Sequence, residues 1–281
     1  MNSIHWLSPG RPDQRTGGYL YNARIAAELR ALGVLVDVVS LEANWPLGGV
    51  SQAEKLAAIP DGAMVVADGL LWPGLLANER ATLLARTTVW VVVHSLVDKE
   101  GGENLTAMET LALSEAHGCF ATSQRTATIV AQRLGRGSVP VIVPGTHPAQ
   151  REARPGANRL LAVGHVIPRK GYLALLDALA SIQEQMWTLD IVGSLDRDPA
   201  HALAVQDAVR SRGLVERIRF MGELGQDDLD RAYAGADLLV HAAHFEAFGM
   251  VLTEGLRRGL PVISTPAGAL DGVSSGAVRV V

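Results

Sequence analysis

The chain has 281 residues, enough for two domains of ordinary size that each bury a core. Its 25 lysines and arginines are outnumbered by 29 aspartates and glutamates, and the net charge of −4 argues against a nucleic-acid partner. A single cysteine, Cys119, excludes an intrachain disulfide. No apolar run approaches the roughly 20 residues that cross a bilayer. The N-terminus lacks the features of a signal peptide, so we expect a cytoplasmic protein without a transmembrane segment.

Short apolar runs alternate with longer amphipathic segments in the first half of the chain. We expect strands at residues 4–7, 34–41, 63–67, 89–93, 119–121 and 139–143. Apolar spacing typical of helices appears between them, for example over residues 18–32 and 123–134. Such alternation indicates an α/β domain built on a parallel sheet.

A second series of the same kind follows a polar stretch that contains two prolines. We expect its strands at residues 159–163, 189–192, 218–221, 238–241 and 262–264. This division predicts a Rossmann-like domain over residues 1–145, a linker over residues 146–157 and a second Rossmann-like domain over residues 158–281. Because ligands of such folds bind beyond the carboxyl ends of the strands, we expect the two parallel sheets to face each other across a cleft.

Motifs of several other enzyme classes are absent. The sequence has no GxGxxG after the first strand, no P-loop and no GxSxG elbow, which disfavours dehydrogenases, kinases and serine hydrolases. The window at residues 241–256 is more informative, since it follows an expected strand and enters an expected helix. Gly249 allows close backbone approach to a ligand, and the free amides of the following helix can bind a phosphate. Glu246 then lies beside that anion site.

Glu254 is expected more than one turn into the same helix, where its carboxylate can accept hydrogen bonds from ribose hydroxyls. The alternative is structural, with Glu246 favouring the helix start through its dipole and Glu254 solvated.

Arg169 and Lys170 follow the expected strand at residues 159–163 and are expected at a helix start. The helix dipole disfavours cations there, so a polyanion such as a diphosphate is the expected neighbour. The alternative is an exposed basic turn.

The first domain offers two further candidate sites. Gly17 and Gly18 open the first expected helix without a side chain that blocks its amides, which suits a second phosphate contact. His94 directly follows the strand at residues 89–93, where its imidazole can hydrogen-bond a sugar hydroxyl. The alternatives are a flexible glycine turn and a structural histidine. His241 and His244 are too few for a metal site, and none is expected.

Together these windows resemble the retaining glycosyltransferases of family 4, which have the GT-B fold of two Rossmann-like domains and include glycogen-synthase-like and mannosyltransferase-like enzymes. The strongest piece is Glu246-Ala247-Phe248-Gly249-Met250, with Glu254 and the G-x-P-V strand at residues 259–263. Segments similar to the family's other landmarks occur in the same order at residues 163–171, 190–193, 220–222 and 234–237.

The resemblance implies a role for each matching position. Glu246 and His94 would act on the transferred sugar, and Glu254 would bind the ribose. The remaining contacts to the donor would come from Arg169, Lys170, Gly17 and Gly18 at the diphosphate, the backbone of Phe248, Gly249 and Met250 at the sugar and phosphate, and Gly193, Met221, Gly222, Glu223 and Leu224 around the nucleobase.

The resemblance also implies the reaction, which is retaining transfer of a hexose from a UDP-, GDP- or ADP-sugar to an acceptor hydroxyl, with no cofactor and no essential metal. The acceptor is expected to be a sugar, a lipid-linked molecule or a small molecule. The chain ends within an expected apolar strand where relatives continue, so the C-terminal domain is expected to be incomplete. A non-catalytic donor-binding subunit or fragment and a nucleotide-sugar epimerase of related fold stay open as alternatives.

Overall fold

The structure is a computed structural model that describes residues 3–10, 16–43, 45–97, 105–146, 158–267 and 278–281. The chain divides into two compact units, Met1–Pro144 and Gly145–Val281. Most of the expected linker, residues 147–157, lies outside the described residues.

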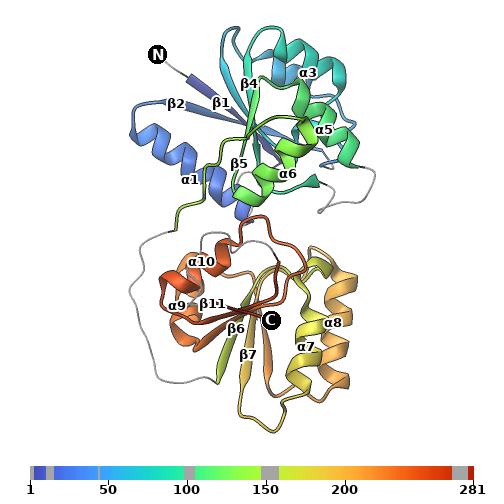
Figure 1. Cartoon of the computed structure of the whole chain (residues 1–281), viewed down its shortest axis with the longest axis vertical. Coiled ribbons are helices and arrows are strands. Elements are labelled where there is room, and N and C mark those ends of the chain that lie inside the picture. The colour runs from blue at the N-terminus through green and yellow to red at the C-terminus, as the bar shows by residue number, and fades with distance from the viewer. Residues whose placement is uncertain (1–2, 11–15, 44, 98–104, 147–157, 268–277) are drawn as a thin grey trace. The chain divides into compact units, whose positions relative to one another are not determined.

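The first unit contains a sheet in which all strands are parallel, in the order β2-β1-β3-β4-β5 (Figure 1). Its strands are, in chain order, β1 (Ser3–Pro9), β2 (Leu35–Leu41), β3 (Met64–Asp68), β4 (Thr88–Val93) and β5 (Gly118–Ala121). The helical segments are α1 (Gly17–Ala31), α2 (Ala53–Ala57), η1 (Trp72–Gly74), α3 (Ala77–Leu84), α5 (Leu105–Glu115) and α6 (Gln124–Leu134).

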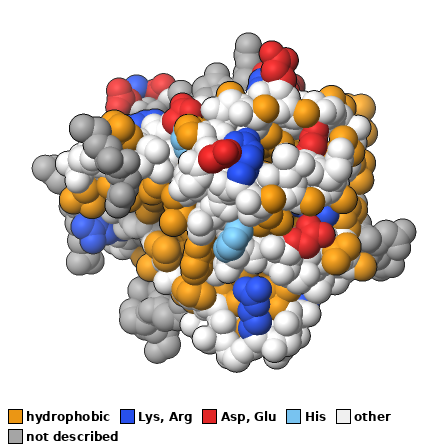
Figure 2. All heavy atoms as spheres, turned by 90° about the horizontal axis from the view of Figure 1, so that it is seen from above, with side chains coloured by type: hydrophobic (Ala, Val, Ile, Leu, Met, Phe, Trp, Pro, Cys, Tyr) orange, Lys and Arg blue, Asp and Glu red, His pale blue; other side chains and the backbone are white. Residues whose placement is uncertain are grey.

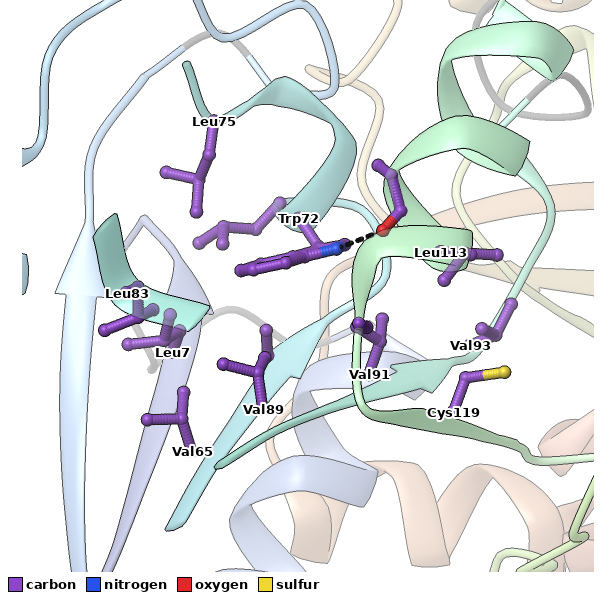
Figure 3. Close-up of a cluster of buried hydrophobic side chains, with 14 of the residues drawn as sticks. Leu7, Val65, Trp72, Leu75, Leu83, Val89, Val91, Val93, Leu113 and Cys119 are labelled. Carbon is purple, nitrogen blue, oxygen red and sulfur yellow. Dashed lines mark hydrogen bonds between the residues drawn. The ribbon is translucent and has the colours of Figure 1, made fainter. Parts of the chain in front are cut away.

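Two hydrophobic clusters cover the two faces of this sheet, as parallel sheets require. On one face α1 packs through Tyr21 and Ala26. On the other, strand residues such as Val91 pack with the remaining helices (Figure 3). Trp72 is fully buried there, and its indole nitrogen donates a hydrogen bond to the carbonyl oxygen of Ala112 over 2.7 Å.

The expected strand at residues 139–143 is wrong. Only one isolated bridge forms, between Ala121 and Val141. The amide of Ala121 donates to Pro140, and the amide of Ile142 donates to Ala121. Pro140 has no amide hydrogen, and Pro144 follows shortly after, so a longer ladder cannot form through this segment.

The second unit contains a parallel sheet in the order β11-β10-β9-β6-β7-β8. Its strands are β6 (Arg159–Val163), β7 (Thr188–Val192), β8 (Ile218–Gly222), β9 (Leu238–His241), β10 (Val262–Ser264) and β11 (Val278–Val280). The helical segments are η2 (Pro168–Lys170), α7 (Tyr172–Ala180), α8 (Pro199–Ser211), α9 (Gln226–Gly235) and α10 (Met250–Arg257).

Successive side chains of β6 point to opposite faces of the second sheet, and each face is covered by its own helices. Leu160 and Ala162 pack with α7 and α8, whereas Leu161 packs with α9 and α10. Figure 1 shows these helix pairs on opposite sides of the sheet. Since β6 pairs with β9, the loops that follow these two strands start at neighbouring points of the same sheet edge.

Candidate functional site

The loops after β6 and β9 touch each other in the second unit. Gly171 has φ +67°, and a Cβ atom there would lie 2.0 Å from the carbonyl oxygen of Ala242. The amide of His244 donates to the carbonyl oxygen of Arg169 over 2.9 Å. Only glycine permits this approach, which brings the turn carrying Arg169 and Lys170 against the loop that carries Glu246.

The two cations lie just before the first turn of α7, next to the helix start that the sequence predicts. They lie in the 3₁₀ turn η2, and α7 begins only at Tyr172 after the left-handed Gly171. Lys170 directly precedes Gly171, the N-cap of α7, so both cations lie beside a helix end that disfavours positive charge. Their suitability for an anion rests also on the following contacts.

Glu246 is the centre of a buried charge cluster. The ammonium group of Lys170 donates a hydrogen bond to its Oε1 atom. A guanidinium nitrogen of Arg169 lies 3.8 Å from the same oxygen and donates to the carbonyl oxygen of Phe245 over 3.0 Å. The Nε2 atom of His241 lies 3.4 Å from Oε1. The Arg169 and Lys170 side chains are 22% and 13% exposed, so the alternative of an exposed basic turn is wrong.

Burial of Glu246 by itself raises the pKa of its carboxyl group, but neighbouring groups reverse that effect. His241, Lys170 and Arg169 together lower the pKa to about 2. Glu246 is thus an anion at neutral pH, and it balances cations that would be costly to bury unpaired.

Helix α10 begins immediately after this cluster. Gly249 is its N-cap with φ +78°, and glycine has no side chain that could cap the helix amides. Phe248, Gly249 and Met250 therefore carry the amino-terminal end of α10, which is the favourable end for an anion. The arrangement offers two cations, a carboxylate and a helix N-terminus within one short region of the sheet edge.

Glu254 lies on α10 and is not freely solvated. Its Oε2 atom accepts a hydrogen bond from the hydroxyl group of Tyr233 over 3.1 Å. Arg258 stacks its guanidinium group 4.6 Å from the centre of the Tyr233 ring. Burial, followed by the charge of Glu254, raises the pKa of Tyr233 well above its usual value, so Tyr233 stays a hydrogen-bond donor that orients the carboxylate.

The residues expected around a nucleobase lie at the carboxyl ends of the neighbouring strands β7 and β8. The amide of Gly193 donates to the carbonyl oxygen of Gly222 over 2.8 Å. A Cβ atom on Gly193 would lie 2.1 Å from the carbonyl oxygen of Gly164, which packs the ends of β6 and β7 closely. Met221 is 41% exposed, whereas Leu224 packs against the core beneath α9 and α10. Glu223 lies between them in the chain, just after β8.

In the first unit the structure brings Gly18 and His94 together. A Cβ atom on Gly18 would lie 3.3 Å from the His94 ring. Gly17 is the first residue of α1, and the side chain of the N-cap residue Thr16 makes no capping hydrogen bond. Burial lowers the pKa of His94, while the charge of Asp68 raises it by a smaller amount.

Sequence reasoning missed two partners of His94. The Oδ1 atom of Asn22 lies 2.8 Å from Nε2 of His94, and Oδ2 of Asp68 lies 3.5 Å from the same nitrogen. Asp68 ends β3, which pairs with β4 just before His94. Asp68 and His94 are polar residues at the carboxyl ends of two strands. Once the order of these strands in the sheet is known, the sequence therefore indicates that the two side chains lie close together.

The described residues contain neither a candidate metal cluster nor a candidate membrane-spanning helix. They contain no group of three or more His, Cys, Asp or Glu residues placed to hold a metal ion. They also contain no helix with the length and apolar character needed to span a membrane. On the side drawn in Figure 2, the described acidic and basic side chains are scattered among apolar ones.

Comparison with known proteins gives the context of this geometry. Residues 145–275 match the family model for glycosyl transferases group 1. The 2-deoxystreptamine glucosyltransferase of Streptomyces kanamyceticus is 27% identical over 267 residues, with 84% of this chain and 68% of that protein covered. The lipopolysaccharide glucosyltransferase WaaG of Escherichia coli is 39% identical over 111 residues, but only 38% of this chain and 28% of WaaG are covered.

A similar solved structure covers both units. It is the crystal structure of Anabaena HepE in complex with UDP and glucose, with a TM-score of 0.75 and 22% identity over 96% of this chain and 82% of that one. The chain has the GT-B fold. This confirms the fold class predicted from the sequence. The family match covers nearly all of the second unit, which holds Arg169, Lys170 and Glu246. Together with the similar proteins, this match supports glycosyl transfer as the general activity.

Proposed function

We propose that the chain transfers a hexose from a nucleoside-diphosphate sugar to an acceptor hydroxyl, with retention at the transferred carbon, as a member of glycosyltransferase family 4. The observation that carries the proposal is the cluster of Arg169, Lys170 and Glu246 beside the uncapped start of α10. These groups match a ligand that combines a diphosphate with sugar hydroxyls, because cations and helix amides bind phosphate and a carboxylate accepts from hydroxyls.

In this proposal Arg169 and Lys170 stabilise the charge that develops on the departing diphosphate, so that no divalent metal is required. The amides at Gly249 and Met250 add hydrogen bonds to the same group or to the sugar. Glu246 binds hydroxyls of the transferred sugar, and Glu254, oriented by Tyr233, binds the ribose. The base lies beside Gly193 and the segment 221–224.

UDP is the proposed carrier. HepE was solved with UDP and glucose, and the curated relatives include glucosyltransferases. A UDP-hexose is therefore the first donor to examine, ahead of GDP- and ADP-sugars. The acceptor is a sugar, a lipid-linked molecule or a small molecule that offers a hydroxyl group.

Thermal unfolding of the purified chain with UDP, GDP, ADP and their sugar conjugates tests the donor. Selective binding to the folded state raises the apparent stability, by about 2.7 kcal/mol at a ligand concentration 100 times the Kd. We expect a response to UDP and UDP-hexose. A response to none of the nucleotides would contradict the donor-site assignment.

Release of UDP from UDP-hexose then separates transfer from the alternatives. An acceptor hydroxyl that accelerates release supports a transferase. Conversion of the UDP-hexose into its epimer without an acceptor would instead indicate an epimerase, and binding without either reaction would indicate a donor-binding subunit.

A further inference from the structure

The polar groups around His94 form a chain with a defined direction. The Nδ2 atom of Asn22 donates to Oδ2 of Asp68 over 2.8 Å, and the Oδ1 atom of Asn22 lies 2.8 Å from Nε2 of His94. The Oδ1 atom of Asp68 accepts from the amide of Leu70 over 2.8 Å. Asn22 and Asp68 are 6% and 5% exposed, so water does not replace these bonds easily.

The chemistry of these groups leaves one proton arrangement. An ionised carboxylate only accepts hydrogen bonds, so Asn22 must present its NH₂ group to Asp68. The amide of Asn22 therefore presents its oxygen to His94. An oxygen acceptor at 2.8 Å requires a hydrogen on Nε2 of His94.

We propose that Asp68, acting through Asn22, holds neutral His94 in the tautomer protonated at Nε2, leaving Nδ1 to accept a hydrogen bond from a hydroxyl of the transferred sugar. Asp68 and Asn22 are then positioning residues. The tautomer follows from the first unit alone, whereas the sugar contact rests on the proposed function.

The surroundings of the ring support this assignment. Nδ1 has no hydrogen-bond partner among the described residues, since the side-chain contacts of the ring run through Nε2, and the His94 side chain keeps 16% of its surface exposed. Gly18 packs against the ring carbons, and Tyr21 contacts the ring edge with centroids 5.0 Å apart. These contacts limit rotation of the ring, so the free nitrogen keeps its direction. A group that only accepts hydrogen bonds, such as a carbonyl or phosphate oxygen, would find no donor at Nδ1.

The ¹⁵N resonances of the His94 ring test the tautomer directly in the full chain. At mildly alkaline pH we expect Nε2 to show the shift of a protonated ring nitrogen and Nδ1 that of an unprotonated one. Comparison with His94→Gln identifies the His94 signals among those of the 8 histidines. Protonation at Nδ1, or rapid averaging between the two forms, would overturn the assignment.

Asp68→Asn tests the relay. The new side chain keeps its acceptor toward Leu70 and turns a donor toward Asn22, so the Asn22 amide reverses and presents its NH₂ group to His94. We expect the two His94 nitrogens to exchange their protonation states. Adding Asn22→Asp to this variant supplies an acceptor beside Nε2 and restores the original tautomer. An unchanged His94 spectrum in Asp68→Asn would overturn the relay.

Asp37→Asn is the matched control, because Asp37 lies 3.3 Å from another histidine of the first unit, His5. It should leave the His94 resonances in place. Addition of UDP-hexose should shift the Nδ1 resonance, whereas UDP alone should not, and an unmoved Nδ1 with UDP-hexose bound would overturn the sugar contact. Failure of every nucleotide to bind would count against the proposed function while the tautomer result stands.

Discussion

Glu246 combines burial with an unusually acidic carboxyl group. Neighbouring His241, Lys170 and Arg169 outweigh its burial and lower the pKa to about 2. Because this value lies below that of an unfolded glutamate, about 4.3, the ionised carboxylate stabilises the fold above that pH. The stabilisation is lost as the pH falls through about 2.

Glu246→Gln should therefore destabilise the chain at neutral pH by up to about 3 kcal/mol, and the difference from the parent should shrink as the pH falls from about 4 to 2. Urea unfolding of both proteins over this pH range measures the effect. Glu216→Gln, which changes an exposed carboxylate of the same unit, is the control. A difference that stays constant with pH would show that the charge of Glu246 is not its source.

Arg169 touches both the loop carbonyl of Phe245 and the carboxylate of Glu246. If it also contacts the diphosphate, Arg169→Ala should slow hexose transfer by about 100-fold, as loss of a charge-stabilising donor does in other enzymes. Initial rates with a UDP-hexose and the identified acceptor measure this. Arg210→Ala is the matched control, because the Arg210 side chain forms an exposed ion pair with Asp207 on α8. Equal rates for the parent and Arg169→Ala would refute the role.

At the scale of the elements, Gly171 fixes how the turn η2 meets the loop after β9. Gly171 and Gly213 have almost the same φ, +67° and +69°, but only Gly171 has a neighbour within 4 Å of an added Cβ atom. Gly213→Ala should therefore report backbone strain alone, about 1 kcal/mol. Gly171→Ala should cost more and should also abolish stabilisation by UDP-hexose, because the cations move away from Glu246. Thermal unfolding with and without the ligand checks both results, and equal losses in the two variants would contradict this account.

The strand and helix pattern was predictable where apolar residues repeat at a clear period. Strand β6 has the expected bounds, and α6 begins after Ser123, whose side chain caps it by accepting from the amide of Thr126. The strand prediction for residues 139–143 was wrong because their apolar residues match a strand pattern, while Pro140 interrupts the pairing. A hydrophobic pattern does not show that one residue, here Pro140, lacks the amide hydrogen needed for strand pairing.

The candidate site was predictable as a set of residues but not as a set of contacts. Arg169, Lys170 and Glu246 were each identified, yet their mutual ion pairs depend on the pairing of β6 with β9, which local patterns do not reveal. The same limit hid Asn22 and Asp68, since their relation to His94 depends on the order of β3, β4 and α1 in space.

At the scale of the whole molecule, each unit has its own hydrophobic core. Leu7 belongs to the core of the first unit and Leu176 to that of the second, and both are fully buried. Either leucine changed to alanine should cost about 2 to 5 kcal/mol in its own unit. We expect Leu7→Ala to speed amide hydrogen exchange in the first sheet and Leu176→Ala in the second, measured by mass spectrometry. Equal acceleration in both sheets for both variants would contradict separate cores.

The pairing of β6 with β9 also determines at which stage of its synthesis the chain becomes able to bind the nucleotide sugar. Lys170 and Glu246 are separated by 76 positions, and three strands of the sheet, β7, β8 and β9, lie between them in the chain. Contacts so distant in sequence form late, after the intervening chain has been ordered. A nascent chain still on the ribosome would therefore carry the cation turn for much of its synthesis without the carboxylate that balances it, and affinity for the nucleotide sugar should appear only near the end of folding.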